Sequence, residues 1–155
     1  MTAPSTAAIE RTLRIEARPE IVFGLLTDAE QMVRWQGIAA EIDARPGGVY
    51  RCQLTTQGLT SVGRFVEVTP YTRVVFTWGW EPQVYPIAPG STTVEITLTP
   101  DGAGTVMHFR HSGLPNLPEV TESHGSGWDH YFERLAILAA GGDLPYDPWR
   151  DGAMG

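Results

Sequence analysis

Cysteine, basic residues and long apolar runs are all scarce in this chain, and each shortage narrows what the protein can be. Cys52 is the only cysteine, so the chain can form neither an internal disulfide nor a thiolate zinc cluster. There are 11 basic against 18 acidic residues, and the resulting net charge of −7 repels phosphate groups. We therefore expect neither nucleic acid nor a membrane surface as a partner.

No stretch of the sequence has the features of a membrane span or of a secretion signal. Spanning a bilayer takes about 18 uninterrupted apolar residues, and the chain has no such run. Residues 1–9 lack the basic and apolar regions of a signal peptide. Together with the single cysteine, these observations lead us to expect a cytoplasmic protein.

The length of 155 residues fits one domain with one hydrophobic core. Residues 1–8 are small and polar, and we expect them to form a flexible tail. Residues 143–155 carry Pro145 and Pro148 without helical or strand periodicity, so we expect a second tail there. No repeat or low-complexity linker interrupts residues 9–142, which we predict to be one continuous domain.

After a first strand near residues 9–16, the sequence predicts two short helices. Pro19 suits the first turn of a helix, because the amide that proline lacks has no partner there. Thr27 and Glu30 have the spacing of a capping box, in which each side chain satisfies an amide at the start of a helix. We expect this second helix to run to about Trp35.

The remaining residues predict an antiparallel sheet and one long helix. From residue 38 to residue 111, turn signals separate about six alternating strands. Val94, Ile96 and Leu98 share one face of such a strand, so the sheet has a dry and a wet face. The helix expected from about residue 118 to residue 140 has a wide apolar stripe that must cover the dry face. The predicted fold class is therefore α+β, with about seven strands and two short helices after the first.

Short motifs that occur in order along the chain carry a family resemblance. They are Ile15–Phe23, Leu26–Asp28, Trp35, Pro46–Gly48, Gly63–Pro70, Arg73–Trp78, Gly104–Thr105, His111–Leu114, Gly127–Trp128 and Leu135. The set resembles the START-like (SRPBCC) superfamily, in particular the family of the activator of heat-shock-protein ATPase, often grouped with polyketide cyclases and dehydrases. The resemblance implies a helix-grip fold, in which a curved sheet wraps around the long helix. It also implies an internal pocket for lipids, sterols, aromatic polyketides or hormones.

Large apolar side chains on the predicted inner surfaces are the candidates for the wall of such a pocket. Val74, Phe76, Trp78 and Trp80 alternate on one strand face, and these side chains either interdigitate fully or line a void. The predicted cavity-lining residues are Trp35, Tyr50, Phe65, Glu67, Phe76, Trp78, Trp80, Met107, Phe109, His111, His124, Trp128, Phe132 and Leu135.

Three polar residues are candidates for contact with a ligand. Alternation places His111 on the apolar side of its strand, and His124 belongs to the apolar stripe of the long helix. Glu67 points inward by the same alternation, although one β-bulge would reverse its direction. These groups either bind a polar end of the ligand or perform acid–base chemistry on it. The alternative is that Glu67 pairs with a group on a neighbouring strand, such as Arg51 or Tyr50, and each histidine is a hydrogen-bonded core residue.

The histidines have no metal-binding pattern. His108 and His111 project to opposite faces of a strand. His124 and His130 are six residues apart, roughly 240° around a helix axis. The glycines of residues 102–104 lack the Lys-Ser/Thr that completes a phosphate-binding loop, and a hairpin turn explains them. We expect neither a metal nor a cofactor.

Three functions fit these features. The first is binding of a small, largely apolar or aromatic molecule in an internal cavity. The second is a cyclase, dehydratase or hydrolase that would use Glu67 and His111 in the same pocket. The third is a co-chaperone-like interaction module that stimulates a heat-shock ATPase, although fold similarity alone does not transfer function. The sequence leaves a homodimer open.

Overall fold

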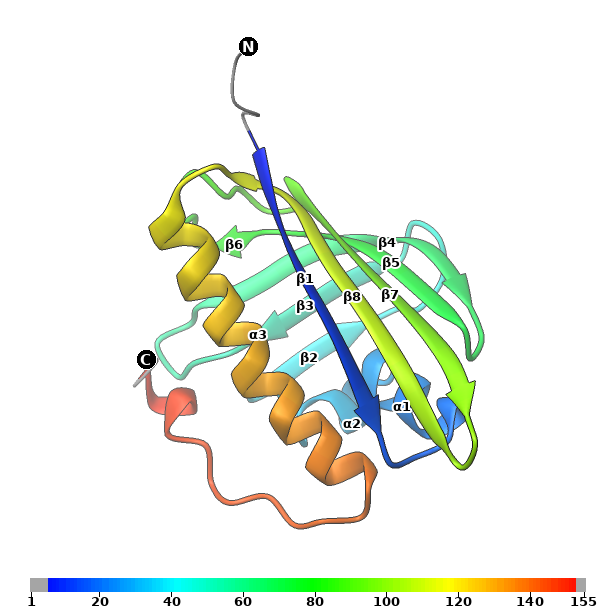
Figure 1. Ribbon diagram of the computed structural model, residues 1–155. Coiled ribbons are helices and arrows are strands. Elements are labelled where there is room, and N and C mark those ends of the chain that lie inside the picture. Colours follow the sequence, from blue (N-terminus) through cyan, green and yellow to red (C-terminus); the bar gives the residue numbers. More distant parts are fainter. Residues whose placement is uncertain (1–5, 153–155) are drawn as a thin grey trace.

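Alternating polar and apolar residues build an open antiparallel sheet around a long helix in the computed structural model, which describes residues 6–152 (Figure 1). The strands are β1 (Thr6–Ile15), β2 (Ala39–Ile42), β3 (Val49–Gln53), β4 (Thr60–Thr69), β5 (Arg73–Trp78), β6 (Trp80–Glu81), β7 (Thr92–Asp101) and β8 (Gly104–Pro115). Their order across the sheet is β1-β8-β7-β5-β4-β3-β2, and β6 pairs with β4. The predicted α+β helix-grip fold is confirmed, with eight strands where about seven were expected.

The helices of the described residues are α1 (Pro19–Thr27), α2 (Ala29–Met32), α3 (Pro118–Ala139) and the 3-10 turn η1 (Pro148–Asp151). The predicted capping box of Thr27 and Glu30 is wrong by one residue. The Asp28 carboxylate caps α2 by accepting a hydrogen bond from the Gln31 amide at 3.1 Å. The Thr27 hydroxyl instead donates to the Phe23 carbonyl at 2.7 Å, at the end of α1.

The dry face of the sheet packs against α3, as the alternation predicts. Val94, Ile96 and Leu98 of β7 are all buried. On the neighbouring β8, Phe109 is buried and His108 is exposed, so the two faces separate residue by residue. The sheet curves around α3, which lies along its concave side (Figure 1). Burial of this face is the main source of favourable free energy for the fold.

The prediction that Glu67 points inward is wrong, because a β-bulge lies just before it. Phe65 pairs with Phe76, but Glu67 pairs with Val75, so β4 carries one extra residue between the two pairs. One extra residue reverses the direction of every later side chain on that strand. The Glu67 side chain is exposed and accepts a hydrogen bond from Arg73 at 3.3 Å. The alternative of pairing with a neighbouring strand is thus confirmed, with Arg73 of β5 as the partner in place of Arg51 or Tyr50.

The described part of the expected C-terminal tail folds back onto the domain. We call residues 143–152 the C-terminal strap. Its Asp147 is buried, and both carboxylate oxygens lie 3.0 Å from His130 Nε2 of α3. The Trp149 ring stacks on the His130 ring with centroids 3.7 Å apart. The Thr56 amide also donates to the Arg150 carbonyl at 2.8 Å, so the strap joins α3 to the β3–β4 loop.

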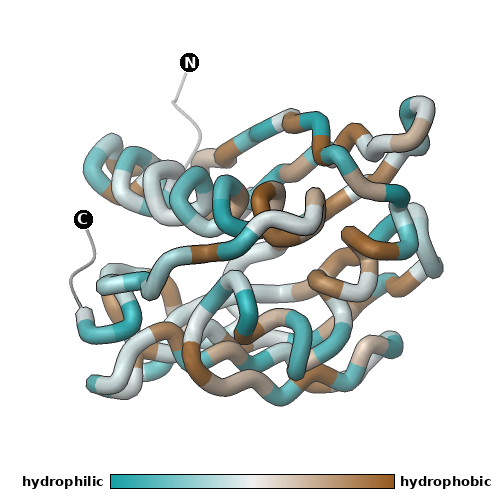
Figure 2. Tube along the Cα trace, turned by 90° about the horizontal axis from the view of Figure 1, so that it is seen from below, coloured by the Kyte–Doolittle hydropathy of each residue, from teal (hydrophilic) through white to brown (hydrophobic). Residues whose placement is uncertain are grey.

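The N-terminal strand begins earlier than expected. Residues 6–8 of the expected flexible tail belong to β1, where Thr6 and Ala7 pair with β8, and residues 1–5 lie outside the described residues. Hydrophobic and hydrophilic stretches alternate along the coloured part of the trace in Figure 2. Accordingly, none of the helices between residues 6 and 152 is long and apolar enough to cross a membrane.

Candidate functional site

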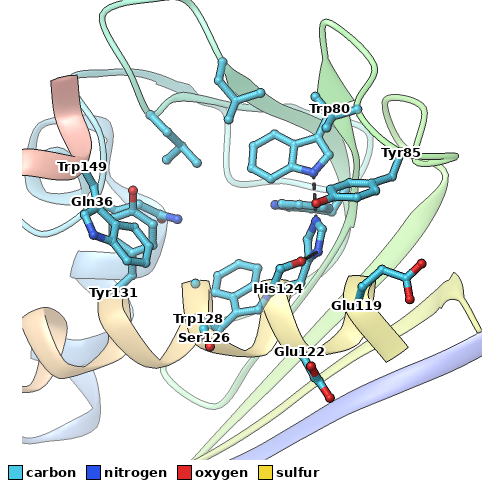
Figure 3. Close-up of a pocket in the computed structure, with 16 residues that line it drawn as sticks. Gln36, Trp80, Tyr85, Glu119, Glu122, His124, Ser126, Trp128, Tyr131 and Trp149 are labelled. Carbon is cyan, nitrogen blue, oxygen red and sulfur yellow. Dashed lines mark hydrogen bonds between the residues drawn. The ribbon is translucent and has the colours of Figure 1, made fainter. Parts of the chain in front are cut away.

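A cavity of about 590 Å³ lies between α3, strands β5 and β6, three loops and the C-terminal strap (Figure 3). Four of the five tryptophans in the chain and two of its five tyrosines line it. The lining residues are Gln36, Leu54, Leu59, Trp78, Trp80, Val84, Tyr85, Glu119, Glu122, Ser123, His124, Ser126, Gly127, Trp128, Tyr131 and Trp149. Its volume lies within the range of roughly 300 to 1,000 Å³ that is usual for small-molecule sites.

The structure brings four of the predicted wall residues to this cavity: Trp78, Trp80, His124 and Trp128. Apart from the outward-facing Glu67, the other predicted residues lie in the packed core and not among the lining residues. They are Trp35, Tyr50, Phe65, Phe76, Met107, Phe109, His111, Phe132 and Leu135. Tyr50 stacks on Phe76 with ring centroids 4.1 Å apart, for example. These side chains fill the layer between sheet and helix.

The remaining wall comes from residues that sequence reasoning missed. Leu54 and Leu59 flank the β3–β4 turn, Tyr85 lies in the loop after β6, and Trp149 belongs to the strap. Tyr131 was part of the apolar stripe on the long helix, and that stripe was the one signal that could have identified it. Loop residues carry no periodicity, so no pattern in the sequence assigns them to a wall.

His111 is held as a neutral ring by a continuous chain of hydrogen bonds beside the cavity. Trp128 Nε1, which can only donate, lies 3.0 Å from His111 Nδ1, so Nδ1 accepts. His111 Nε2 therefore carries the proton and donates to the Thr92 hydroxyl at 2.8 Å. That hydroxyl donates onward to the Trp78 carbonyl at 2.7 Å. Burial, reinforced by the nearby His124, lowers the pKa of His111 to about 3.

His124 is held in the opposite tautomer on the cavity wall. Trp80 Nε1 donates to His124 Nε2 at 3.0 Å (dashed in Figure 3), so the proton of this ring is on Nδ1. His124 Nδ1 donates to the Val120 carbonyl at 2.8 Å, one turn earlier in α3. Burial lowers the pKa of His124, and the Val120 hydrogen bond opposes that effect in part. Both histidines thus use both ring nitrogens within the protein.

Three buried polar atoms of the wall residues have no hydrogen-bond partner in the protein. They are Trp78 Nε1, Gln36 Oε1 and the Tyr131 hydroxyl. Most buried polar groups in folded proteins are paired, so three unpaired atoms among the residues around one cavity are an exception. The charged residues of the lining are both acidic, Glu119 and Glu122. Within residues 6–152, no three His, Cys, Asp or Glu side chains cluster in a way that could hold a metal ion.

Similar folds are known among solved structures. An AHSA1-like protein of Rhizobium etli is 37% identical, with a TM-score of 0.73, and the match covers 94% of this chain and 89% of that one. A Chromobacterium violaceum protein is 26% identical, with a TM-score of 0.72 and coverage of 89% and 99%. An HSP90 activator of Plasmodium falciparum shares the fold at 23% identity, with a TM-score of 0.71 and coverage of 84% and 94%.

A family model covers most of the domain, whereas no curated protein matches the chain significantly. Residues 16–140 match the model described as Activator of Hsp90 ATPase homolog 1-like protein. That range runs from the end of β1 to the end of α3, and so includes the strands β5 and β6 and the helix α3 that line the cavity. The resemblance read from the sequence motifs is thereby confirmed, and the chain belongs to the Activator of Hsp90 ATPase homolog 1-like family.

Proposed function

We propose that this protein binds a small, largely apolar or aromatic molecule in the cavity between its sheet and α3. The observation that carries the proposal is a cavity of about 590 Å³ walled by four tryptophans and two tyrosines. Aromatic side chains offer large apolar contact areas and favourable ring stacking to a flat ligand. A reducing cytoplasm is the compartment we propose, since the single cysteine, Cys52, is a buried free thiol.

A thermal-shift screen of small aromatic and lipid-like compounds tests the proposal. A ligand at 100 times its Kd stabilises the folded state by about 2.7 kcal/mol. Native mass spectrometry of the purified protein gives an independent measurement, because it detects a co-purified molecule. If no compound in the screen raises the melting temperature and no bound mass appears, the proposal is wrong.

A blocking variant locates any binding in this cavity. Gly127 lines the cavity, and a Cβ built on it meets nothing within 4 Å. Gly127→Leu therefore places a branched apolar side chain at the cavity wall, where its Cβ meets no other atom, and leucine is also a better helix former than glycine. We expect this variant to lose ligand binding and remain folded. Glu133→Leu, at an exposed position of the same helix, is the matched control and should bind normally.

Neither Glu67 nor His111, the two residues named for the enzyme hypothesis, is placed to act in the cavity. Glu67 lies on the outer face of the sheet, paired with Arg73. His111 has both nitrogens engaged by Trp128 and Thr92, so it offers no free base. An enzyme in this cavity would need other catalytic groups.

A chaperone partner is a second candidate, because the matching family model is named for activation of the Hsp90 ATPase. One structural neighbour is an HSP90 activator, and another is the Aha1 dimer of Colwellia psychrerythraea. Both are below 25% identity and support the fold alone. Adding this protein to an Hsp90 ATPase assay tests that role. An unchanged ATPase rate would exclude activation. Sedimentation velocity tests separately whether this protein forms a homodimer.

A further inference from the structure

One end of the cavity holds two orphaned polar atoms with complementary chemistry. In Figure 3, Gln36, Tyr131 and Trp149 gather at this end, while Trp80, Tyr85 and His124 lie at the other. Gln36 is 4% and Tyr131 3% exposed, yet Gln36 Oε1 and the Tyr131 hydroxyl have no partner. The amide oxygen can only accept a hydrogen bond, whereas the phenol can donate one.

We propose that this end of the cavity recognises a hydroxyl group on an uncharged aromatic ligand, an inference that rests on the binding function proposed above. A hydroxyl is both donor and acceptor, so a single group can donate to Gln36 Oε1 and accept from Tyr131. A ketone or ether cannot donate to Gln36. A hydrocarbon leaves both atoms unpaired, at the cost of two buried unsatisfied groups.

The charges around the cavity favour an uncharged ligand. Burial raises the pKa of Tyr131, so the phenol stays protonated and able to donate. A ligand carboxylate would find no cation in the lining, whose charged members are Glu119 and Glu122. Those glutamates lie away from Gln36 in Figure 3, so a ligand ammonium at this end would also be buried without a counter-ion. Arg134 and Asp147 nearby already bind each other and their neighbours.

Access to this end passes by the C-terminal strap. Both orphaned atoms are closed off from solvent, so a neighbouring side chain must turn aside when the ligand hydroxyl enters. Trp149 is that side chain. It lines the same cavity, is only partly buried, and its ring meets the ring of Tyr131 edge-on with centroids 5.6 Å apart.

The test compares 4-hydroxybiphenyl with 4-methylbiphenyl and biphenyl-4-carboxylate, three probes of nearly equal shape. Dissociation constants come from quenching of tryptophan fluorescence. We expect the wild type to prefer the hydroxyl probe over the methyl probe, and to bind the carboxylate at least about ten-fold more weakly than either. Tighter binding of the carboxylate than of the hydroxyl probe would overturn the inference.

Substitutions then assign the preference to residues. Tyr131→Phe and Gln36→Met should each lower the ratio of the methyl to the hydroxyl dissociation constant by at least about five-fold. Tyr85→Phe is the matched control, because it removes a phenol from the opposite end of the same cavity and should keep the ratio. Without ligand, the Tyr131→Phe variant should melt at a temperature no lower than the wild type, because the Tyr131 hydroxyl has no hydrogen bond to lose.

The outcomes separate this inference from the function on which it rests. If the probes bind and Gly127→Leu abolishes binding, but Tyr131→Phe leaves the ratio unchanged, the cavity binds ligands and the hydroxyl site is wrong. If none of the probes binds, or if binding survives Gly127→Leu, the proposed function fails and the hydroxyl site fails with it.

Discussion

The buried His111 is expected to make this protein less stable in mild acid. Its ring is fully buried, and its pKa is lowered by burial from 6.5 to about 3. Between these two pH values the unfolded chain binds a proton at this residue that the folded protein does not bind. The free energy of unfolding therefore falls as the pH drops below 6.5, and this contribution is fully lost near pH 3.

The size of the effect follows from the difference between the two pKa values. A pKa difference from 6.5 to about 3, at 1.36 kcal/mol for each pH unit, corresponds to roughly 5 kcal/mol at most. Between pH 6 and pH 4 the share lost is about 2 to 3 kcal/mol. A loss of that size is a substantial part of the stability of an ordinary domain, about 5 to 15 kcal/mol.

Urea denaturation followed by circular dichroism between pH 4 and pH 7 measures this contribution. His111→Gln lacks the titrating ring, so its free energy of unfolding should fall by about 2 to 3 kcal/mol less than that of the wild type from pH 6 to pH 4. His108→Gln is the matched control, because His108 lies exposed on the outer face of the same strand. Parallel pH curves for the wild type and His111→Gln would refute the reasoning, as would an NMR titration in which His111 protonates near pH 6 in the folded state.

Three further predictions use the same urea assay or a kinetic one. Trp128→Ala should lower the free energy of unfolding by about 3 to 5 kcal/mol, because the indole is 5% exposed and packed among aromatic rings; a loss below about 1 kcal/mol would contradict this. Gly63→Ala should destabilise strongly, since its Cβ would lie 1.7 Å from the Thr77 carbonyl oxygen, whereas Gly127→Ala, which meets no atom within 4 Å, should be neutral or stabilising. Removal of residues 143–155 should leave cooperative unfolding intact and speed the dissociation of 4-hydroxybiphenyl in stopped-flow fluorescence, and loss of cooperativity would show that the strap belongs to the core.

The sheet and the long helix could be predicted because each obeys one period throughout. Val94, Ile96 and Leu98 alternate with polar neighbours, and the alternation in β8 placed His111 on the buried face. Such a pattern reports which side of an element is dry. It does not report whether a buried side chain meets another side chain or a void. The pattern therefore could not distinguish Phe109 and Phe132, which pack in the core, from Trp128, which lines the cavity.

Glu67 shows how one β-bulge makes a prediction from strand alternation wrong. Up to Phe65 the alternation along β4 holds, and the bulge then shifts every later residue to the opposite face. Val68 consequently pairs with the buried Val74, and Glu67 reaches Arg73, which also binds Glu95 at 2.9 Å. Nothing in the sequence around this position distinguishes a regular strand from a bulged one, because valine and glutamate suit either.

The strap was beyond prediction for a different physical reason. Its contacts include the pairing of Asp147 with His130, the stacking of Trp149 over the same ring and the packing of Leu144 against the core, and none of these repeats along the chain. A periodic pattern arises when one element buries one face. In a segment that crosses several elements, each residue contacts a different neighbour, so no period results. Trp149 of the strap meets the Tyr131 ring edge-on with centroids 5.6 Å apart, beside the unpaired Tyr131 hydroxyl, and no pattern in the sequence predicts that contact. The cavity is therefore built where the regular elements end, and that is also where a change in a few side chains would alter ligand choice without disturbing the sheet.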